Sequence, residues 1–473
     1  MLETLCRILN EVRSDNTTEA VPPAGKNKKQ EQPETNYPRP PALSAKFAEG
    51  VRFARKKRCP GALADEVMMK THPLFPVLLL SSLSALAASP PSEASKTGKP
   101  FPHVGLRSDD GRSSLDIGGA LRVNYRDEHW KSTENNGRLL FDTFRLDIQA
   151  THEDFFSDLG YWFQDDGKRA IDRGFVGYRF SDLSSLQLGA PFKPFGLEPY
   201  PQFGWSYHIP FFLGYGVSAG SGAKYVYKDA DWHVQAGYFP RMLPGGVRYS
   251  PEVGRYADLD DNAVAAIHSR QDNEKRDQLN LRVARNLAGD GWKSELGASL
   301  AASRLYNATT REDGRYWAAG LHGVLNAGNW TFSGEAIRYA FDPKNPAGVS
   351  DDVVLMGTNG LTPAYLMAAR ASVASFNVAY DVPTPNLGML KKLRFYNDYS
   401  RMFKDKAGWD DSQMYTAGVQ FFALPIMGWL DFTWGRNANP YGGAESGTGF
   451  SSTSSSRSNE WIFRTNLNIG YYF

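Results

Sequence analysis

The sequence contains only two cysteines, and both lie near its start. Cys6 and Cys59 precede every patterned segment, and residues 60–473 contain no cysteine. This excludes disulfide-stapled domains and cysteine-ligated metal sites for most of the chain. Among exported proteins, a long chain without cysteine is more typical of an outer-membrane protein than of a small extracellular one.

Long hydrophobic runs are also absent. A membrane-spanning helix needs about 20 consecutive apolar residues, and the best candidate, LFPVLLLSSLSALAA at residues 74–88, is shorter. A mean hydropathy of −0.45 likewise excludes a bundle of membrane helices. The run follows Met68, Met69 and Lys70 and ends in small residues, which is the pattern of a secretory signal peptide cleaved near Ala87.

This signal peptide divides the chain. Residues 1–67 are rich in proline and charge and show no sustained periodicity, so we expect either disorder or a translation start that lies at the signal peptide itself. The expected signal peptide is 68–87, followed by a flexible periplasmic lead-in at 88–111. The remaining part, 112–473, is the expected folded domain.

The charge balance changes at the same point. Residues 1–87 hold 13 of the 53 basic and 9 of the 51 acidic residues, so the part that follows has a net charge of −2 rather than the +2 of the whole chain. The overall charge therefore gives no indication of nucleic-acid binding, and no nucleic-acid partner is expected.

Strict alternation of apolar and polar residues recurs in the folded domain. Alternate residues of a strand face opposite sides. In the last segment, WIFRTNLNIGYYF, one face carries Trp461, Phe463, Thr465, Leu467, Ile469, Tyr471 and Phe473. The other face is mostly polar and includes Arg464. The segments SLDIGGALRVNYRDE and FRLDIQATHE repeat this pattern.

One face of these strands is apolar and ends in aromatic residues, whereas the opposite face carries Arg, Asp and Gln. This pattern indicates an outer surface that contacts lipid and an inner surface that lines a water-filled lumen. A soluble β-sandwich also alternates, but the signal peptide and the terminal Phe473 favour the membrane protein. We predict an all-β fold, a closed antiparallel transmembrane β-barrel of about 16 strands in the bacterial outer membrane. Its expected partners are outer-membrane lipids and the barrel-assembly machinery, which would engage the C-terminal strand.

The segment Pro191–Gly222 breaks the alternation. It is rich in Pro, Gly and aromatic residues, too long for a hairpin turn and too apolar for a solvated outer loop. Because aromatic side chains need cover from water, we expect it to fold into the lumen as a constriction; an exposed loop or a loop at a subunit contact is the alternative. The candidate constriction residues are Lys193, Glu198, Tyr207 and His208.

The stretch YRFSDLSSLQLGAPFKPFGLEPY, Tyr178–Tyr200, resembles the phosphate-selective porin O and P family. A similar strand end in members of that family corresponds here to Gly189, Phe192, Lys193, Pro194, Phe195, Gly196, Leu197 and Glu198. The resemblance implies a homotrimeric outer-membrane channel that favours anions, phosphate among them. The lysine cluster of the family is reduced here to Lys193 and Lys224, which favours a general or modestly anion-selective porin.

Arginines recur on the polar faces of the expected strands. Guanidinium groups stay charged and match the geometry of oxyanions, so a row of them along a lumen would attract small anions. The candidate anion track consists of Arg122, Arg126, Arg145, Arg173, Arg179, Arg282, Arg394 and Arg464. Acidic residues such as Asp147 and Asp431 share these faces, so pairing across strands is the alternative.

The leading hypothesis is passive diffusion of small hydrophilic, preferentially anionic solutes. A substrate-specific channel for sugars or aromatic compounds is a second possibility, since aromatic residues in 199–222 could guide such solutes. An enzymatic barrel would need a nucleophile motif, and none is recognisable around the histidines. No HExxH or Cys/His cluster indicates a metal, and no cofactor is expected.

Overall fold

The structure is a computed structural model that describes residues 101–129, 136–164, 167–243, 251–254, 271–357, 364–438 and 459–473. All of them belong to the second of two units into which the chain divides, Leu83–Phe473. The expected N-terminal extension, the signal peptide and the first part of the lead-in lie outside the described residues. Within the described residues, no helix is long and apolar enough to cross a bilayer.

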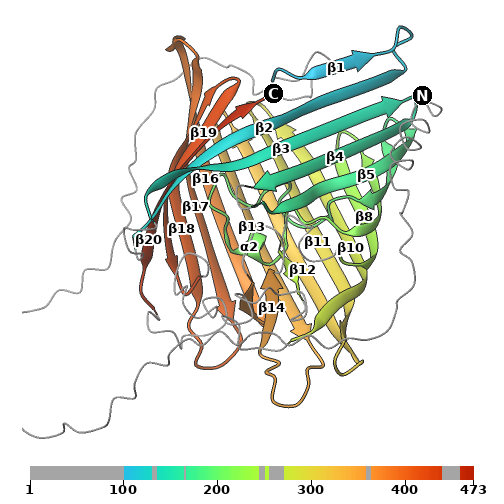
Figure 1. The fold of residues 1–473 in the computed structure, drawn as a ribbon, viewed down its shortest axis with the longest axis vertical. Coiled ribbons are helices and arrows are strands. Elements are labelled where there is room, and N and C mark those ends of the chain that lie inside the picture. Colours follow the sequence, from blue (N-terminus) through green and yellow to red (C-terminus); the bar gives the residue numbers. More distant parts are fainter. Residues whose placement is uncertain are drawn as a thin grey trace, which may run out of the picture. The chain divides into compact units, whose positions relative to one another are not determined.

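A single closed barrel dominates the fold (Figure 1). Its sheet contains 17 strands, of which all but β1 form the wall of a 16-strand barrel. The wall strands are β2 (Ser113–Glu128), β3 (Arg138–His152), β4 (Phe155–Gln164), β5 (Arg169–Ser181), β6 (Ser184–Ala190), β7 (Ser221–Lys228), β8 (Trp232–Arg241), β10 (Asn273–Gly289), β11 (Trp292–Asn307), β12 (Asp313–Ala327), β13 (Trp330–Asp342), β16 (Arg370–Leu387), β17 (Leu390–Lys404), β18 (Ser412–Ala423), β19 (Ile426–Arg436) and β20 (Ile462–Tyr472). Each pairs antiparallel with its neighbours.

The first and last wall strands close the barrel. β2 pairs with β20 from Ala120 opposite Tyr472 to Glu128 opposite Arg464. Gly119 donates its N–H to the carbonyl of Phe473 at 2.6 Å, which extends the ladder to the last residue. A lipid environment offers backbone groups no partners, so a membrane sheet has to be closed in this way. The predicted fold class and the predicted strand number are both confirmed.

Part of the expected flexible lead-in is a strand. β1 (Val104–Arg107) pairs with β2, from Val104 opposite Ile117 to Arg107 opposite Ser114. The expectation of a flexible segment over 88–111 is therefore wrong for these four residues. The reason lies in the stagger of the barrel, because β20 ends opposite Ala120 and leaves the first residues of β2 without a partner on that side. β1 supplies that partner.

The two ends of the barrel differ in their connections. At one end, seven tight turns of two or three residues join consecutive strands, at 153–154, 182–183, 229–231, 290–291, 328–329, 388–389 and 424–425. The terminal residue Phe473 lies at this end. The strands joined by the long connections 191–220, 242–272, 343–369 and 437–461 begin and end at the other end. Bacterial barrels have short periplasmic turns and long extracellular loops, which assigns the tight turns to the periplasm.

The wall has an apolar outer face and a polar inner face. Along β20, Phe463, Leu467 and Tyr471 face outward, whereas Arg464 and Asn468 point inward and are buried. Large apolar side chains are exposed around the whole outer surface, among them Leu279, Leu300, Leu321, Phe376 and Phe395. Such a surface requires a lipid cover. The closed barrel and its apolar coat place the protein in the bacterial outer membrane, as predicted.

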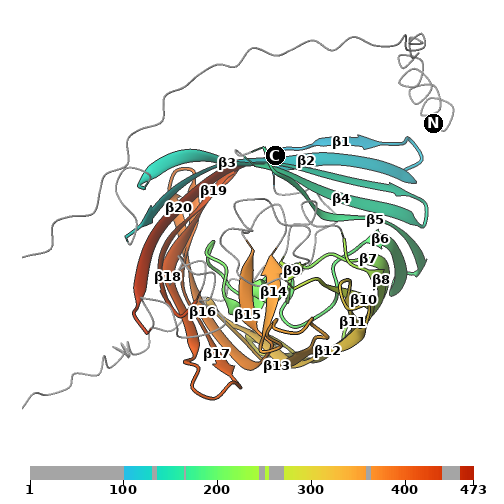
Figure 2. The same ribbon diagram turned by 60° about the horizontal axis from the view of Figure 1, so that its bottom comes forward.

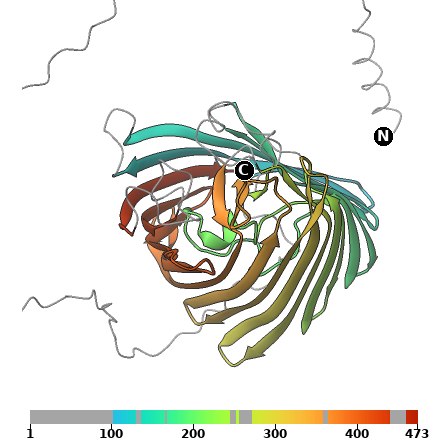
Figure 3. The same cartoon turned by 90° about the horizontal axis from the view of Figure 1, so that it is seen from below.

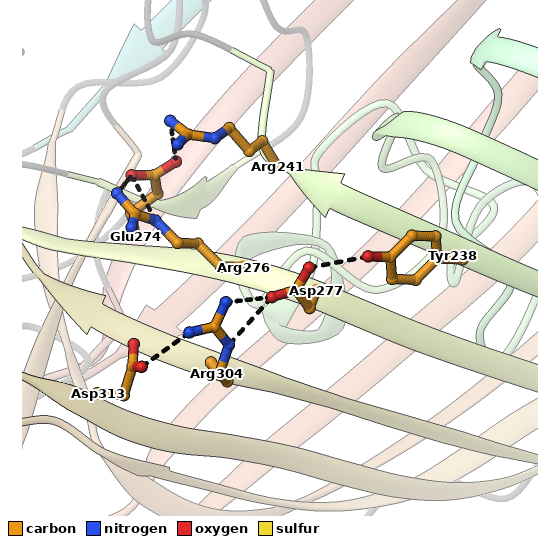
Figure 4. A network of polar contacts seen from close by, with 7 residues as sticks. All are labelled: Tyr238, Arg241, Glu274, Arg276, Asp277, Arg304 and Asp313. Atoms are coloured by element: carbon orange, nitrogen blue, oxygen red, sulfur yellow. Dashed lines mark hydrogen bonds and ion pairs between the residues drawn. The ribbon is translucent and has the colours of Figure 1, made fainter.

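Charged side chains replace this coat at the loop end of the wall (Figure 4). Arg304 on β11 contacts Asp277 on β10 and Asp313 on β12, and Asp277 also accepts a hydrogen bond from the Tyr238 hydroxyl at 2.8 Å. Asp277 sits in a bulge of β10 with φ +52°. The network pairs both signs and marks the polar rim above the apolar band.

The interior of the barrel holds a second, smaller sheet. β9 (Glu252–Val253), β14 (Val353–Gly357) and β15 (Tyr365–Ala368) come from two long connections and pair antiparallel in the order β15-β14-β9. Views along the barrel show these strands inside the ring of wall strands (Figures 2 and 3). Every residue of β14 and β15 is buried. This sheet packs in one apolar cluster with the segment 191–220 and with inward residues of the wall.

Candidate functional site: the narrowed bore

The connection 191–220 runs through the lumen. Its short helix α2 (Ile209–Phe212) is fully buried, and contacts of the helix reach β16 and β17 of the wall. Figure 3 shows this segment inside the ring of strands. Tyr365 of β15 donates its hydroxyl to the carbonyl of Phe212 at 2.6 Å, which ties the segment to the inner sheet. The predicted infolded loop is confirmed, and we call residues 191–220 the constriction loop.

Two wall carboxylates hold the tip of the constriction loop. Asp398 on β17 accepts hydrogen bonds from the N–H groups of Phe203 at 3.1 Å and Gly204 at 2.7 Å. Asp431 on β19 accepts the N–H of Ser206 at 2.6 Å. Both carboxylates are fully buried. Backbone donors of a buried loop need partners, and bonds to a carboxylate are among the stronger ones, so these two residues fix where the tip lies.

His208 also anchors the constriction loop to the wall. Its ring nitrogens lie 3.1 Å from the hydroxyl of Ser400 and 2.9 Å from that of Thr416. Burial lowers the pKa of His208 to about 3. A serine hydroxyl beside a histidine ring can be part of a catalytic pair. Here His208, Ser400 and Thr416 are all fully buried, so no substrate can reach them. The ring is therefore a neutral structural contact rather than a cationic group exposed to solutes.

This burial predicts a pH effect on stability. The folded-state pKa of about 3 lies below the ordinary value of 6.5, so the contribution of His208 is complete above pH 6.5 and declines as the pH falls toward 3. The midpoint temperature of thermal unfolding should therefore decrease when the pH is lowered from about 7.5 to about 5. Part of this decrease should be missing in His208→Gln. Equal pH slopes for the two proteins would contradict this assignment.

Lys193 lies in a buried ion cluster. Its ammonium group contacts the carboxylate of Glu252 on β9, which also pairs with Lys275 on β10 at 2.7 Å. Burial alone would raise the pKa of Glu252, but the two ammonium groups outweigh it and hold that pKa well below its ordinary value. The Lys275 ammonium also lies 3.9 Å from the ring centre of Tyr316. The structure thus pairs the ammonium group of Lys193 with a carboxylate of the protein.

The remaining predicted loop residues have separate surroundings. Glu198 accepts a hydrogen bond from the side-chain amide of Gln235 on β8 at 2.7 Å. The ring of Tyr207 stacks on Phe211, with centroids 3.8 Å apart and planes 11° apart. Tyr207 also borders the open space between the loop tip and the wall. The four predicted constriction residues therefore share one loop but do not form one site, and their functional roles stay predictions.

The eight predicted arginines occupy inward positions of the wall, but several are balanced by carboxylates. Arg173 contacts Asp147, Asp158 and Asp172. The others with acidic partners are Arg145 with Asp147, Arg282 with Glu295 and Arg394 with Asp381. Arg464 donates to the hydroxyl of Ser206 at 2.9 Å, and Arg179 lies over the ring of Phe156. Arg126 is exposed on β2. Carboxylates of the wall thus pair with several arginines of the predicted anion track.

A cavity lies between the loop tip and the neighbouring part of the wall. It has a volume of about 290 Å³, and its lining includes Arg122, Arg145, Trp162, Gln202, Trp205 and Trp429. The guanidinium of Arg122 lies 4.5 Å from the ring centre of Trp162 and 4.9 Å from that of Trp205. None of the described residues that line the cavity is acidic. Arg145 nevertheless pairs with Asp147 beside the cavity at 2.7 Å, and the anion track stays a prediction.

Sequence reasoning missed most of the aromatic part of this cavity. Trp162 occupies an inward position of β4, and Trp429 lies on β19. Trp205 lies within the aromatic segment 191–222, so the sequence does indicate its place in the constriction. The alternation of a strand shows which side chains face the lumen, but not which side chains of different strands lie close together there. The sequence alone therefore does not place these aromatic side chains in one cavity.

Comparisons with known proteins identify the fold. No family model matches the chain, and no curated protein matches it. Among solved structures, the outer-membrane channel DcaP of Acinetobacter baumannii is 13% identical, with a TM-score of 0.50, covering 78% of this chain and 99% of that one. The fold is that of a bacterial outer-membrane channel.

Two further solved structures give weaker superpositions. OmpF of Salmonella typhi in complex with daunomycin is 14% identical, with a TM-score of 0.49, covering 78% of this chain and 100% of that one. An anion-selective porin from Comamonas acidovorans is 11% identical, with a TM-score of 0.46, covering 76% of this chain and 100% of that one. At such identities the likeness concerns the fold alone, and the resemblance to the phosphate-selective porins stays a prediction.

Proposed function

We propose that the protein is an outer-membrane porin for passive diffusion of small hydrophilic solutes, with a preference for anions. The observation that carries this proposal is the cavity beside the constriction loop, whose described lining includes Arg122 and Arg145 and no acidic residue. Fixed positive charge at a narrow point lowers the barrier for anions and raises it for cations. Phosphate is a candidate solute, and assembly as a homotrimer belongs to the same proposal.

The pairing of charges in the bore, that of Arg145 with Asp147 included, limits the expected selectivity. Arg173, Arg282 and Arg394 are each balanced by carboxylates of the wall. Lys193 is balanced by Glu252. A modest preference for chloride over potassium is therefore proposed rather than a strongly phosphate-selective channel.

Planar-bilayer recording tests this function. Purified protein should give stable conductance steps, and the reversal potential in a KCl gradient should have the sign of chloride preference. The variant Arg145→Gln should shift that potential toward zero, because it removes a charge that lines the cavity. Arg401→Gln is a matched control, since Arg401 pairs with Asp411 near the loop end of the wall. Absence of conductance, or cation preference, would contradict the proposal.

A further inference from the structure

The cavity beside the constriction loop combines charge with flat apolar walls. It lies between residues 200–207 of the loop and the inner faces of β2, β3, β4, β19 and β20. The rings of Trp205 and Trp429 lie 5.2 Å apart, centre to centre, at 47°. Such walls offer stacking surface and dispersion contacts to a planar solute.

The charged groups of the cavity point to an anionic head group. Arg145 donates its Nε–H to Asp147 at 2.7 Å, and its Nη groups have no hydrogen-bond acceptor among the described residues. Its guanidinium carbon lies 5.8 Å from the ring centre of Trp162. The two arginines thus stand directly beside aromatic rings. A carboxylate bound to such a guanidinium would bring its attached group against those rings.

A buried amide supplies a separate observation. Gln202 lines the cavity, is 8% exposed, and its Oε1 has no hydrogen-bond partner among the described residues. A buried polar atom without a partner is costly, so this atom favours a bound donor, either water or a polar group of a solute. The cavity therefore contains a cationic side, apolar planar walls and one unsatisfied polar group.

The size of the cavity suits a solute with a single ring. Its volume of about 290 Å³ lies at the lower end of small-molecule sites, which span roughly 300–1,000 Å³. We propose that this cavity is a binding subsite for a small aromatic carboxylate at the constriction. The carboxylate faces Arg145 and Arg122, and the ring lies against Trp205 and Trp429. This inference extends the proposed channel function and depends on it.

Recording of single channels with benzoate tests the subsite. Benzoate should interrupt the potassium chloride current at concentrations about 3- to 10-fold lower than cyclohexanecarboxylate, because the two share charge and approximate size and differ in the aromatic face. Glucose and inorganic phosphate should interrupt the current less than benzoate does. Equal effects of benzoate and cyclohexanecarboxylate, or stronger block by glucose or phosphate, would overturn the inference.

Variants separate binding from general effects on the pore. Arg145→Gln should weaken block by benzoate about 10- to 100-fold, as expected for loss of a charged hydrogen-bond donor. Trp205→Leu should remove the preference for benzoate over cyclohexanecarboxylate, whereas Trp205→Phe should keep most of it. In Arg401→Gln, benzoate should block the current at the same concentrations as in the wild type. A preference that persists in Trp205→Leu would contradict the placement of the ring.

The failure of this inference differs from failure of the channel function. A protein that gives no conductance steps would overturn the proposed function itself. Stable steps without a preference for benzoate would leave the channel intact and overturn only the subsite. The mobility of unheated protein on gels shows for each variant that the barrel is folded, so loss of block in a folded variant reports on binding.

Discussion

Replacing Asp398 with alanine is expected to release the tip of the constriction loop and to increase the single-channel conductance. The substitution removes the acceptor of two buried backbone donors, those of Phe203 and Gly204. Leaving such donors unsatisfied costs about 1–3 kcal/mol each. A loss of about 3 kcal/mol would change the ratio of docked to released loop about a hundredfold. Conductance and proteolysis of residues 191–220 in detergent measure this release.

Two variants serve as controls for this experiment. Asp398→Asn keeps one acceptor oxygen and should have an intermediate effect. Asp411→Ala makes the same substitution at a carboxylate that pairs with Arg401 and has no contact with the constriction loop among the described residues, so the conductance should stay at the wild-type value. An unchanged conductance in Asp398→Ala, with a folded barrel, would show that Asp398 does not hold the tip.

Replacing Glu252 with glutamine is expected to separate the inner sheet from the constriction loop. The carboxylate lies between Lys193 and Lys275, which are 6% and 3% exposed. Its loss removes a carboxylate that two buried ammonium groups share, and breaking a buried pair in this way costs about 3–5 kcal/mol. We expect a lower unfolding temperature and fluctuating open-channel current, measured by circular dichroism and by bilayer recording.

The partner charges provide the control for this variant. Adding Lys193→Met to Glu252→Gln removes one of the two ammonium groups and should recover part of the lost stability. Asp352→Asn breaks a partly exposed pair with Lys406 and should have little effect, because exposed ion pairs contribute little. A Glu252→Gln protein as stable as the wild type would contradict the structural importance of the cluster.

The same cluster predicts resistance to mild acid. The pKa of Glu252 is held well below its ordinary value of 4.5, so the stability it contributes is fully present above pH 4.5 and is lost only as the pH falls through the lower folded-state value. Open-channel current noise should therefore be the same at about pH 7 and pH 5. The assignment would be contradicted if lowering the pH from about 7 to about 5 increased the noise in the wild type but not in Glu252→Gln.

The periodicity of the sequence was sufficient to predict the wall of the barrel. In β20 the outward side chains of Phe463 and Leu467 and the inward side chain of Arg464 follow from parity alone, since parity is a local property of a strand. The constriction loop could also be predicted, because residues 191–222 combine aromatic content with a lack of alternation. Both features depend on neighbouring residues in the sequence.

The interior of the site could not be predicted in the same way. Lys193 meets Glu252 across 59 residues of sequence, and Asp398 meets Gly204 across 194. Such contacts depend on how several long connections fold against each other inside the wall, and no local pattern encodes them. For the same reason, parity located inward arginines such as Arg173 but could not show that carboxylates on neighbouring strands balance them.

A pair of engineered cysteines tests the closed barrel most directly. Tyr125 on β2 lies opposite Leu467 on β20 across the closing seam, and Leu430 on β19 lies opposite the same Leu467 on its other side. The part of the chain after Cys59 has no native cysteine. Protein carrying Tyr125→Cys and Leu467→Cys should form an intramolecular disulfide in oxidised outer membranes, as should the control pair Leu430→Cys and Leu467→Cys. Cross-linking of the control pair alone would mean that β2 and β20 are not joined, and would contradict the closed, water-filled bore.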